Sequence, residues 1–176
     1  MGRVVTYEAE KRTLLDVAVH HNDVENSLQD YFSSSSPSAK IRFFDYLPHV
    51  VLTELQERLA EQDKQSSLMV LAHLEARWRT DYLKRCQNKD KDPLSRHLRK
   101  LKRKHGSEVK FEESLLTAWV AFSGIEKRLA SEIKAAFKFR HWLAHGRYWE
   151  PDLGRRFDYH YIYQLAKECD SYFKYA

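Results

Sequence analysis

The chain has 176 residues, of which 43% are hydrophobic, 13% aromatic and 31% charged, and its net charge is +5. So many large apolar side chains can bury a core, which excludes a wholly disordered protein. Five Gly and four Pro supply too few turns for a many-stranded β-protein, and no apolar run reaches the ~18 residues of a membrane span. The composition therefore predicts an all-α protein with no membrane partner.

Helices are predicted wherever apolar residues recur at steps of three and four. The N-terminal stretch, residues 7–31, follows this pattern and leads into a Ser-rich surface loop at 33–38. The remaining predicted helices span residues 46–60, 68–86, 111–137 and 159–173. Among them, residues 111–137 are expected to form one long core helix. The predicted fold class is therefore an all-α bundle of about five to seven helices.

The length predicts a single domain over residues 1–176, with the N-terminal helix and Ser-rich loop in 1–40 and the core bundle in 41–176. The two cysteines, Cys86 and Cys169, are far apart in the sequence and occupy apolar positions of predicted helices. We therefore interpret both as small core residues rather than as a disulfide or a metal knuckle. A reducing, cytoplasmic location fits this usage best.

Positive charge is concentrated in residues 84–110, which hold 11 Lys or Arg against 3 Asp or Glu. After Pro93 the segment is expected to form a short helix or loop. Such a run is either a solvated face or a surface that follows a phosphate backbone. Under the second interpretation, the candidate RNA-binding residues are Arg96, Arg99, Lys100, Arg103 and Lys104.

Two histidines and an arginine gather where the long predicted helix ends. His141 and His145 are four residues apart and therefore lie on one helix face. Arg140 lies about 140° around the axis from His145, so the two side chains can border one cleft without contact. Gly146 is well placed to end the helix in a left-handed conformation.

These residue types suit RNA cleavage without a metal. That reaction needs a base for the 2′-hydroxyl, an acid for the leaving 5′-oxygen and a fixed cation for the phosphate, which imidazole and guanidinium groups supply. Zinc is the direct competitor, because two histidines at i and i+4 can share a metal. A zinc protease motif, however, would have Glu where this chain has Trp142, and the segment offers no third ligand. We therefore expect no metal and no cofactor.

Two further interpretations stay open for this segment. Arg140 and the histidines could form only a solvated helix end. Arg147, Tyr148 and Trp149 could add a phosphate contact and a stacking surface for an unpaired base. Alternatively, the two aromatic residues fold back onto the core and Arg147 caps backbone carbonyls.

The run from Arg140 to His145 resembles the Arg-x(4–6)-His signature of the HEPN superfamily (higher eukaryote and prokaryote nucleotide-binding domains). In that signature the residue after Arg is usually Asn, Asp or His, and here it is His141. The expected long helix before the motif and shorter helix after it also agree with the family. The run from Phe139 to Arg147, with Leu74–Trp78 upstream, is most similar to the RiboL-PSP-like HEPN proteins.

The resemblance implies a metal-independent endoribonuclease that cleaves single-stranded or loop RNA in a toxin–antitoxin or antiviral defence system. It implies a homodimer in which two motifs meet, with an antitoxin or another regulatory protein as a further partner. Arg140 would hold the scissile phosphate, His145 would be general acid or base, and His141 would orient or assist the proton transfer.

The alternative function is a non-catalytic HEPN-like module that binds RNA, a nucleotide or a protein. Glu75 and Asp81 lie on the predicted helix 68–86, and either carboxylate could orient a catalytic Arg or His. The sequence does not choose between them, nor between this role and a plain surface role.

Overall fold

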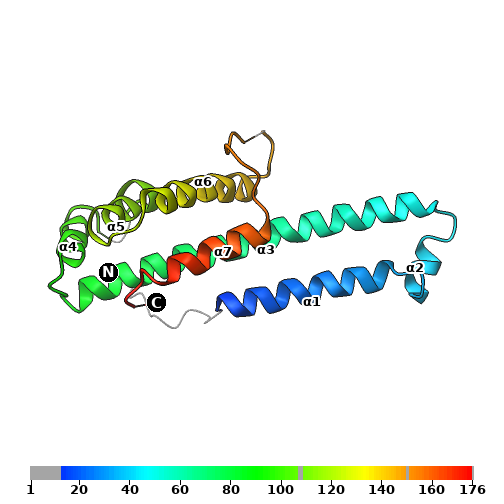
Figure 1. Cartoon of the computed structure of the whole chain (residues 1–176), viewed down its shortest axis with the longest axis horizontal. Coiled ribbons are helices and arrows are strands. Elements are labelled where there is room, and N and C mark those ends of the chain that lie inside the picture. The colour runs from blue at the N-terminus through cyan, green and yellow to red at the C-terminus, as the bar shows by residue number, and fades with distance from the viewer. Residues whose placement is uncertain (1–12, 107–108, 150, 176) are drawn as a thin grey trace. The chain divides into compact units, whose positions relative to one another are not determined.

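The computed structural model describes residues 13–106, 109–149 and 151–175. Within these ranges the chain is helical and contains no strand, which confirms the predicted all-α fold (Figure 1). The elements are α1 (Leu14–Phe32), α2 (Pro37–Arg42), α3 (Pro48–Gln87), α4 (Pro93–His105), the π-helical segment η1 (Phe111–Leu116), α5 (Thr117–Phe122), α6 (Lys127–Ala144) and α7 (Tyr159–Asp170). In the described ranges, no helix combines the length and the apolar character that crossing a membrane requires.

The chain divides into two compact units, Met1–Ser66 and Ser67–Ala176, and the boundary falls inside α3. The first unit contains α1, α2 and the first part of α3, and the second contains the other elements. The domain organisation expected from the sequence, a single domain divided after residue 40, stays a prediction.

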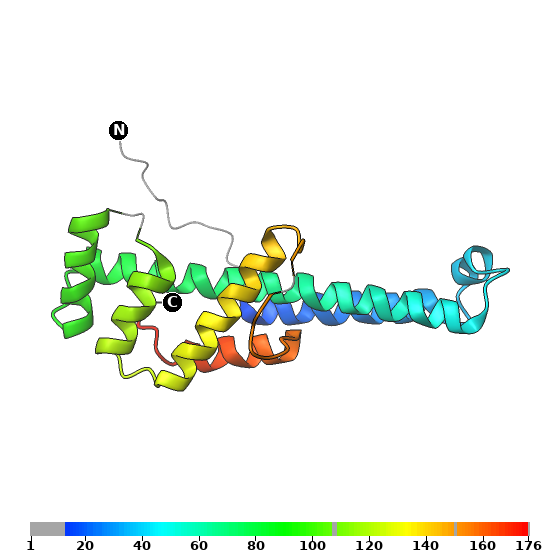
Figure 2. The same cartoon turned by 90° about the horizontal axis from the view of Figure 1, so that it is seen from above.

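In the first unit, α1 and the first part of α3 run side by side (Figures 1 and 2). Thr13 starts α1 with a capping box, since its hydroxyl accepts from the Asp16 N–H and the Asp16 carboxylate accepts from the Thr13 N–H at 2.7 Å. At the other end of α1, Phe32 packs with Phe43 in a small apolar cluster. The cluster fixes the turn between the two helices.

The ends of three predicted elements can be compared with the bounds in the structure. Residues 7–12 of the first predicted helix lie outside the described residues. The Ser-rich loop is shorter than expected, because Ser36 caps α2 and Pro37 occupies its first turn. The last helix is confirmed but ends at Asp170 instead of Phe173.

The helices predicted at residues 46–60 and 68–86 form one continuous helix, α3, in the structure. α3 runs without interruption through residues 61–67, where the apolar spacing is lost but no Gly or Pro is present. Polar residues with no breaker continue a helix when its surroundings support it. Here Ser66 is buried and lies 3.0 Å from Nδ1 of the buried His21 of α1, so a polar contact replaces the apolar stripe.

The single long helix predicted over 111–137 was wrong. It is divided into η1, α5 and α6, with a break at residues 123–126. Gly124 has φ +77°, which no α-helix contains, and the Ser123 hydroxyl donates to the Trp119 carbonyl at 2.6 Å to close α5. Ile125 is nevertheless buried, so the apolar spacing continues through a connection that is not helical.

Trp78 lies at the centre of the second unit. Its ring meets those of Phe111, Trp119 and Phe173 edge-on, with centroids 5.2, 6.4 and 4.9 Å away. Cys86 and Cys169 are both buried, and burial raises the pKa of each thiol. The prediction that both cysteines are small core residues is therefore confirmed.

A buried carboxylate joins three parts of this unit. Asp81 is fully buried and accepts from the Nε–H of Arg85, one turn along α3. Its other oxygen accepts from the backbone N–H groups of Lys174 and Tyr175, each at 2.8 Å. Arg85 also reaches Asp92, the N-cap of α4, at 3.5 Å. Both Asp81 oxygens and the Nε and Nη1 groups of Arg85 thus have partners, as burial of charge requires.

We expect Asp81→Ala to lower the free energy of unfolding by about 3–5 kcal/mol, because it leaves a buried guanidinium and two backbone amides without their acceptor. Urea denaturation followed by circular dichroism measures this change. Asp152→Ala removes an exposed carboxylate and should change stability by about 0.5 kcal/mol or less. Equal effects of the two substitutions would contradict the structural role of Asp81.

Candidate functional site

The two histidines of the motif lie at the C-terminal end of α6. His141 is in the last turn, and His145 is the C-cap. Gly146 follows with φ +84°, so the predicted left-handed end of the helix is confirmed. Both histidines are exposed, and their ring centroids are 4.2 Å apart. The spacing of four residues thus places two titratable rings side by side at the surface.

Of the two aromatic residues that follow α6, only Trp149 packs back against the helix. The indole N–H of Trp142 donates to the Trp149 carbonyl at 2.7 Å, and Leu143 is buried in the core. Tyr148 is 84% exposed and packs edge-on against Trp149, while the Arg147 guanidinium lies 6.0 Å from the Trp142 ring. Trp149 therefore folds back, whereas Tyr148 offers an exposed aromatic face.

Arg140 is held by a carboxylate of α3. Its Nη2 lies 3.1 Å from Oε2 of Glu75, and the other Glu75 oxygen lies 2.7 Å from Nη2 of Arg79. Arg140 has a side chain 34% exposed, and among the described residues its Nη1 has no partner. Of the two carboxylates left open by the sequence, Glu75 orients Arg140, whereas Asp81 belongs to the buried network.

Arg140 is fixed by Glu75, and His141 and His145 lie side by side at the same helix end. No ion pair or ring contact joins Arg140 to His141 or His145 among the described residues, and the cleft that the three side chains would border stays a prediction. Glu75 neutralises part of the guanidinium charge through Nη2, whereas the buried Nε of Arg140 has no hydrogen-bond partner among the described residues. In the described part of the chain, no cluster of three or more His, Cys, Asp or Glu forms around the two histidines.

A second set of candidate residues lies on α4, which the structure shows as a helix. Asp92 caps its start with Pro93 in the first position, and Leu94 and Leu98 are buried against the core. The face opposite carries four exposed cations at helical spacing, for which the described residues provide no ion pair: Arg96, Lys100, Arg103 and Lys104. We call these four residues the basic stripe.

The fifth candidate on α4, Arg99, is placed differently. Its Nη1 donates to the Asp90 carbonyl at 2.5 Å, so it helps to hold the connection before α4. With Cys86, Lys102 and Arg103 it lines a surface hollow of about 480 Å³. Arg99 thus lies beside the basic stripe rather than within it.

Phe122 is a surface residue that the sequence interpretation missed. The apolar spacing assigned it to the core, but it is the last residue of α5 and is 43% exposed. Its ring lies 4.8 Å from that of His97, which is the neighbour of Arg96 on α4. An exposed aromatic ring beside a row of cations is typical of surfaces that bind single-stranded nucleic acid. No pattern in the sequence distinguishes it from a core Phe.

Arg155 and Arg156 lie in the loop before α7 and are not part of the basic stripe. Arg155 donates to the Tyr161 hydroxyl and lies 3.8 Å from Glu132, so it secures the loop before α7. Arg156 is exposed. Figures 1 and 2 place α4 and the C-terminal end of α6 at opposite ends of the second unit. The basic stripe and the Arg140 motif are therefore two surfaces.

Comparisons with protein-family models, with curated proteins and with solved structures gave no match to this chain. The resemblance to the HEPN superfamily consequently rests on the motif at residues 140–145 and the helices around it. It remains a prediction.

We expect a double-mutant cycle of Glu75→Gln and Arg140→Gln to give a coupling of about 1 kcal/mol in unfolding free energy, because the pair is partly buried and charge-assisted. Lys110 and Glu113 provide the control, since their side chains are 72% and 68% exposed at an N–O distance of 2.9 Å. That cycle should give about 0.3 kcal/mol. Equal coupling in the two cycles would show that Glu75 does not hold Arg140.

Proposed function

We propose that this protein is a metal-independent endoribonuclease that cleaves single-stranded or loop RNA at the Arg140, His141 and His145 motif. The observation that carries the proposal is one helix end that holds both the guanidinium of Arg140, fixed by Glu75, and two exposed imidazoles. A fixed cation with two imidazoles that can accept and donate protons is the chemistry that this cleavage needs.

In the proposed reaction a base takes the proton of the 2′-hydroxyl as the 2′-oxygen attacks the neighbouring phosphorus. The bond from phosphorus to the 5′-oxygen breaks, and an acid protonates that oxygen. The products are a 2′,3′-cyclic phosphate and a 5′-hydroxyl end. Nη1 of Arg140 binds the phosphate oxygens, His145 serves as general acid or base, and His141 orients or assists the transfer.

The distance between the imidazoles favours a homodimer. In an in-line displacement the attacking and leaving oxygens lie on opposite sides of phosphorus. Two rings with centroids 4.2 Å apart on one helix face are too close together to hold a phosphate between them. In the proposed dimer, one copy supplies the acid and the other the base, as a two-fold axis permits.

The proposed setting is the cytoplasm, where two buried thiols stay reduced. A toxin–antitoxin or antiviral defence role, with an antitoxin or another regulatory protein as a partner, follows from the resemblance alone. The RNA contacts proposed near the motif are Arg147, whose guanidinium lies over the Trp142 ring, and the exposed Tyr148.

The test is cleavage of a labelled RNA by the purified full chain in excess EDTA, with mapping of the product ends. We expect cyclic phosphate ends from the wild type, and a loss of about 100-fold or more in rate for Arg140→Ala and for His145→Ala. His20→Ala removes an exposed histidine of α1 and should leave the rate unchanged.

Retained cleavage in both motif variants would overturn the assignment of the site. Activity that EDTA abolishes would replace the proposal by a metal-dependent one. No cleavage across varied RNAs, with the protein folded by circular dichroism, would leave the non-catalytic module as the function.

The basic stripe supports that second candidate, an RNA-binding module without catalysis. Its four cations and Phe122 belong to α4 and α5, which lie away from the C-terminal end of α6 (Figures 1 and 2), so they can bind RNA whether or not the motif cleaves it. Arg96, Lys100 and Arg103 are spaced about one helical turn apart, roughly 5–6 Å, which is comparable to the spacing of phosphates along a strand, and Lys104 is the next residue after Arg103.

We expect neutralisation of the basic stripe to reduce the dependence of RNA affinity on salt, with the slope of log K against log salt falling by about 3. Fluorescence anisotropy with a labelled single-stranded RNA measures this slope.

Phe122→Ala should weaken RNA binding about tenfold through lost stacking, measured in the same way. The stripe variant carries Gln at Arg96, Lys100, Arg103 and Lys104, and the control of equal charge carries Gln at the exposed Lys127, Lys134, Lys138 and Lys167.

Equal slopes for these two quadruple variants would show that the stripe contributes only net charge. Unchanged affinity in Phe122→Ala would remove the stacking contact from the proposal.

A further inference from the structure

The surface hollow where the end of α3 meets α4 is lined mainly by cations. Its volume is about 480 Å³, and its lining consists of Cys86 from α3 and of Arg99, Lys102 and Arg103 from α4. Among the described residues that line it none is acidic, and residues 93–105 contain neither Asp nor Glu. We call the hollow formed by these four residues the cationic hollow.

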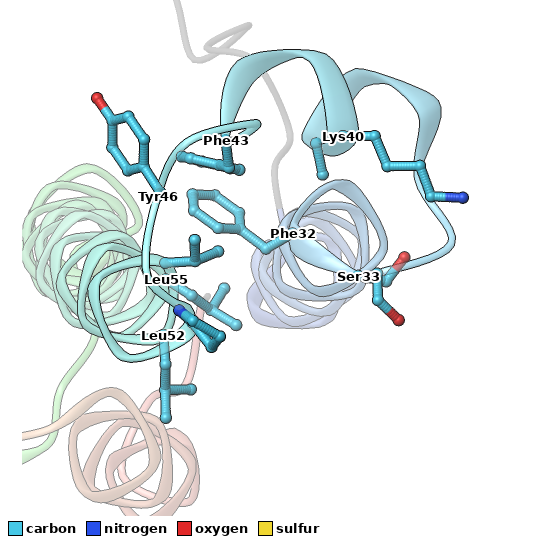
Figure 3. Close-up of a pocket in the computed structure, with 11 residues that line it drawn as sticks. Phe32, Ser33, Lys40, Phe43, Tyr46, Leu52 and Leu55 are labelled. Carbon is cyan, nitrogen blue, oxygen red and sulfur yellow. The ribbon is translucent and has the colours of Figure 1, made fainter.

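The chemistry of this lining differs from that of the apolar pocket beside α2. That pocket has a volume of about 410 Å³, and Figure 3 shows Phe32, Phe43 and Leu55 around it. Among the described residues that line it, Lys40 alone is charged. An apolar wall accepts many partners, whereas three like charges around one hollow specify the sign of the ligand.

No carboxylate compensates the three cations of the hollow. Within the described ranges Arg99, Lys102 and Arg103 form no ion pair, and Nη1 of Arg99 donates to the backbone carbonyl of Asp90. The Asp90 carboxylate is engaged elsewhere, by the ammonium group of Lys174 at 2.9 Å. Residues three and four apart are neighbours on a helix, so the three like charges repel one another. An anion in the hollow relieves this repulsion.

The Cys86 thiol shows that the charges converge. Burial raises the pKa of this thiol, and the charges of Lys102 and Arg99 act on it in the opposite direction. Because such an effect falls off with distance, both cationic groups lie close to the sulfur. The hollow is therefore a place where positive charges from one helix meet beside the end of another.

The macrodipole of α4 opposes an anion here only in part. Lys102 and Arg103 lie in the last turn, where the helix carbonyls carry partial negative charge and compete with the anion. This effect falls off within one turn. Arg99, which lies about one turn earlier and is held by the Asp90 carbonyl, is thus the cation that the macrodipole affects least.

We propose that the cationic hollow binds a phosphate monoester or a polyphosphate, carried either by a free phosphorylated compound or by an RNA strand with a terminal phosphate. A phosphate monoester carries a charge of about −1.5 to −2 near pH 7, whereas each phosphodiester of an RNA backbone carries a single charge. Three cations in one hollow match the more highly charged group. Arg99 and Arg103 also supply planar guanidinium groups, which bind two phosphate oxygens at once. The inference does not depend on the proposed ribonuclease.

Isothermal titration calorimetry of the full chain with pyrophosphate, at constant ionic strength and without divalent cations, tests the site. We expect saturable binding by the wild type. The combined Lys102→Gln and Arg103→Gln variant should lose affinity by about tenfold or more. The matched control combines Lys100→Gln with Lys104→Gln, which removes the same charge from the same helix outside the hollow. This control should bind pyrophosphate as the wild type does.

Alkylation of Cys86 gives a second readout at the hollow itself. Pyrophosphate should slow the reaction of this thiol with iodoacetamide, because the ligand covers the sulfur and offsets the cations that favour the thiolate. The protection should disappear in the Lys102→Gln and Arg103→Gln variant. Cys169, which is 0% exposed, should stay unmodified throughout and thus reports that the protein is folded. Peptide mass spectrometry identifies the modified residue.

Two RNA strands distinguish the sources of the phosphate. Both carry 2′-O-methyl groups, which remove the attacking hydroxyl, and one has a phosphate at each end where the other has hydroxyls. Tighter binding of the phosphorylated strand, lost in the hollow variant and kept in the control, assigns the site to an RNA end. Equal binding of the two strands, together with pyrophosphate binding, assigns it to a free phosphorylated compound.

The absence of both pyrophosphate binding and a preference for the phosphorylated strand would overturn the site. Equal weakening of pyrophosphate binding in the two double variants would do the same, because only net charge would then matter. Since neither probe can be cleaved, these outcomes are independent of the cleavage results.

Discussion

The second unit depends on a single carboxylate that is kept from water. A buried charge is tolerated only when donors surround it, and Asp81 receives them from Arg85 and from the backbone of Lys174 and Tyr175. Through Arg85 the same network reaches Asp92, where α4 begins. One side chain therefore ties the end of α3 to the start of α4 and to the C-terminal segment, and it does so by direction-dependent bonds rather than by apolar packing alone.

The position of the candidate site follows from this constraint. Trp78, Asp81 and Arg85 follow one another along α3 at steps of three and four, so they fix the rotation of the helix about its axis. Glu75 lies on the same helix, one turn before Trp78, and meets Arg140 from there. The guanidinium is thus oriented by a helix whose own register is fixed elsewhere, by buried rings and a buried ion pair.

The sequence pattern correctly predicted the features that depend on neighbouring residues alone. These are the helical class, the proximity of His141 and His145, and the left-handed conformation of Gly146. The sequence pattern did not predict the helix break or the ion pair described next. The break at residues 123–126 is invisible to periodicity, because a buried Ile125 continues the apolar spacing through it. The choice of Glu75 as the partner of Arg140 likewise needs the packing of α3 against α6, which no short stretch of sequence contains.

The macrodipole of α4 affects its positive charges differently at the two ends of the helix. Lys102, Arg103, Lys104 and His105 fill its last turn, where unpaired carbonyls carry partial negative charge, so the free helix already stabilises these cations. Arg96 lies in the first turn, near the positive end of the macrodipole, and has no such compensation. A phosphate bound beside Arg96 would relieve that unfavourable placement, whereas one bound at the far end would compete with the carbonyls of the helix. The two ends of α4 therefore differ: at the N-terminal end Arg96 and the macrodipole have the same sign, whereas at the C-terminal end the cations and the macrodipole have opposite signs.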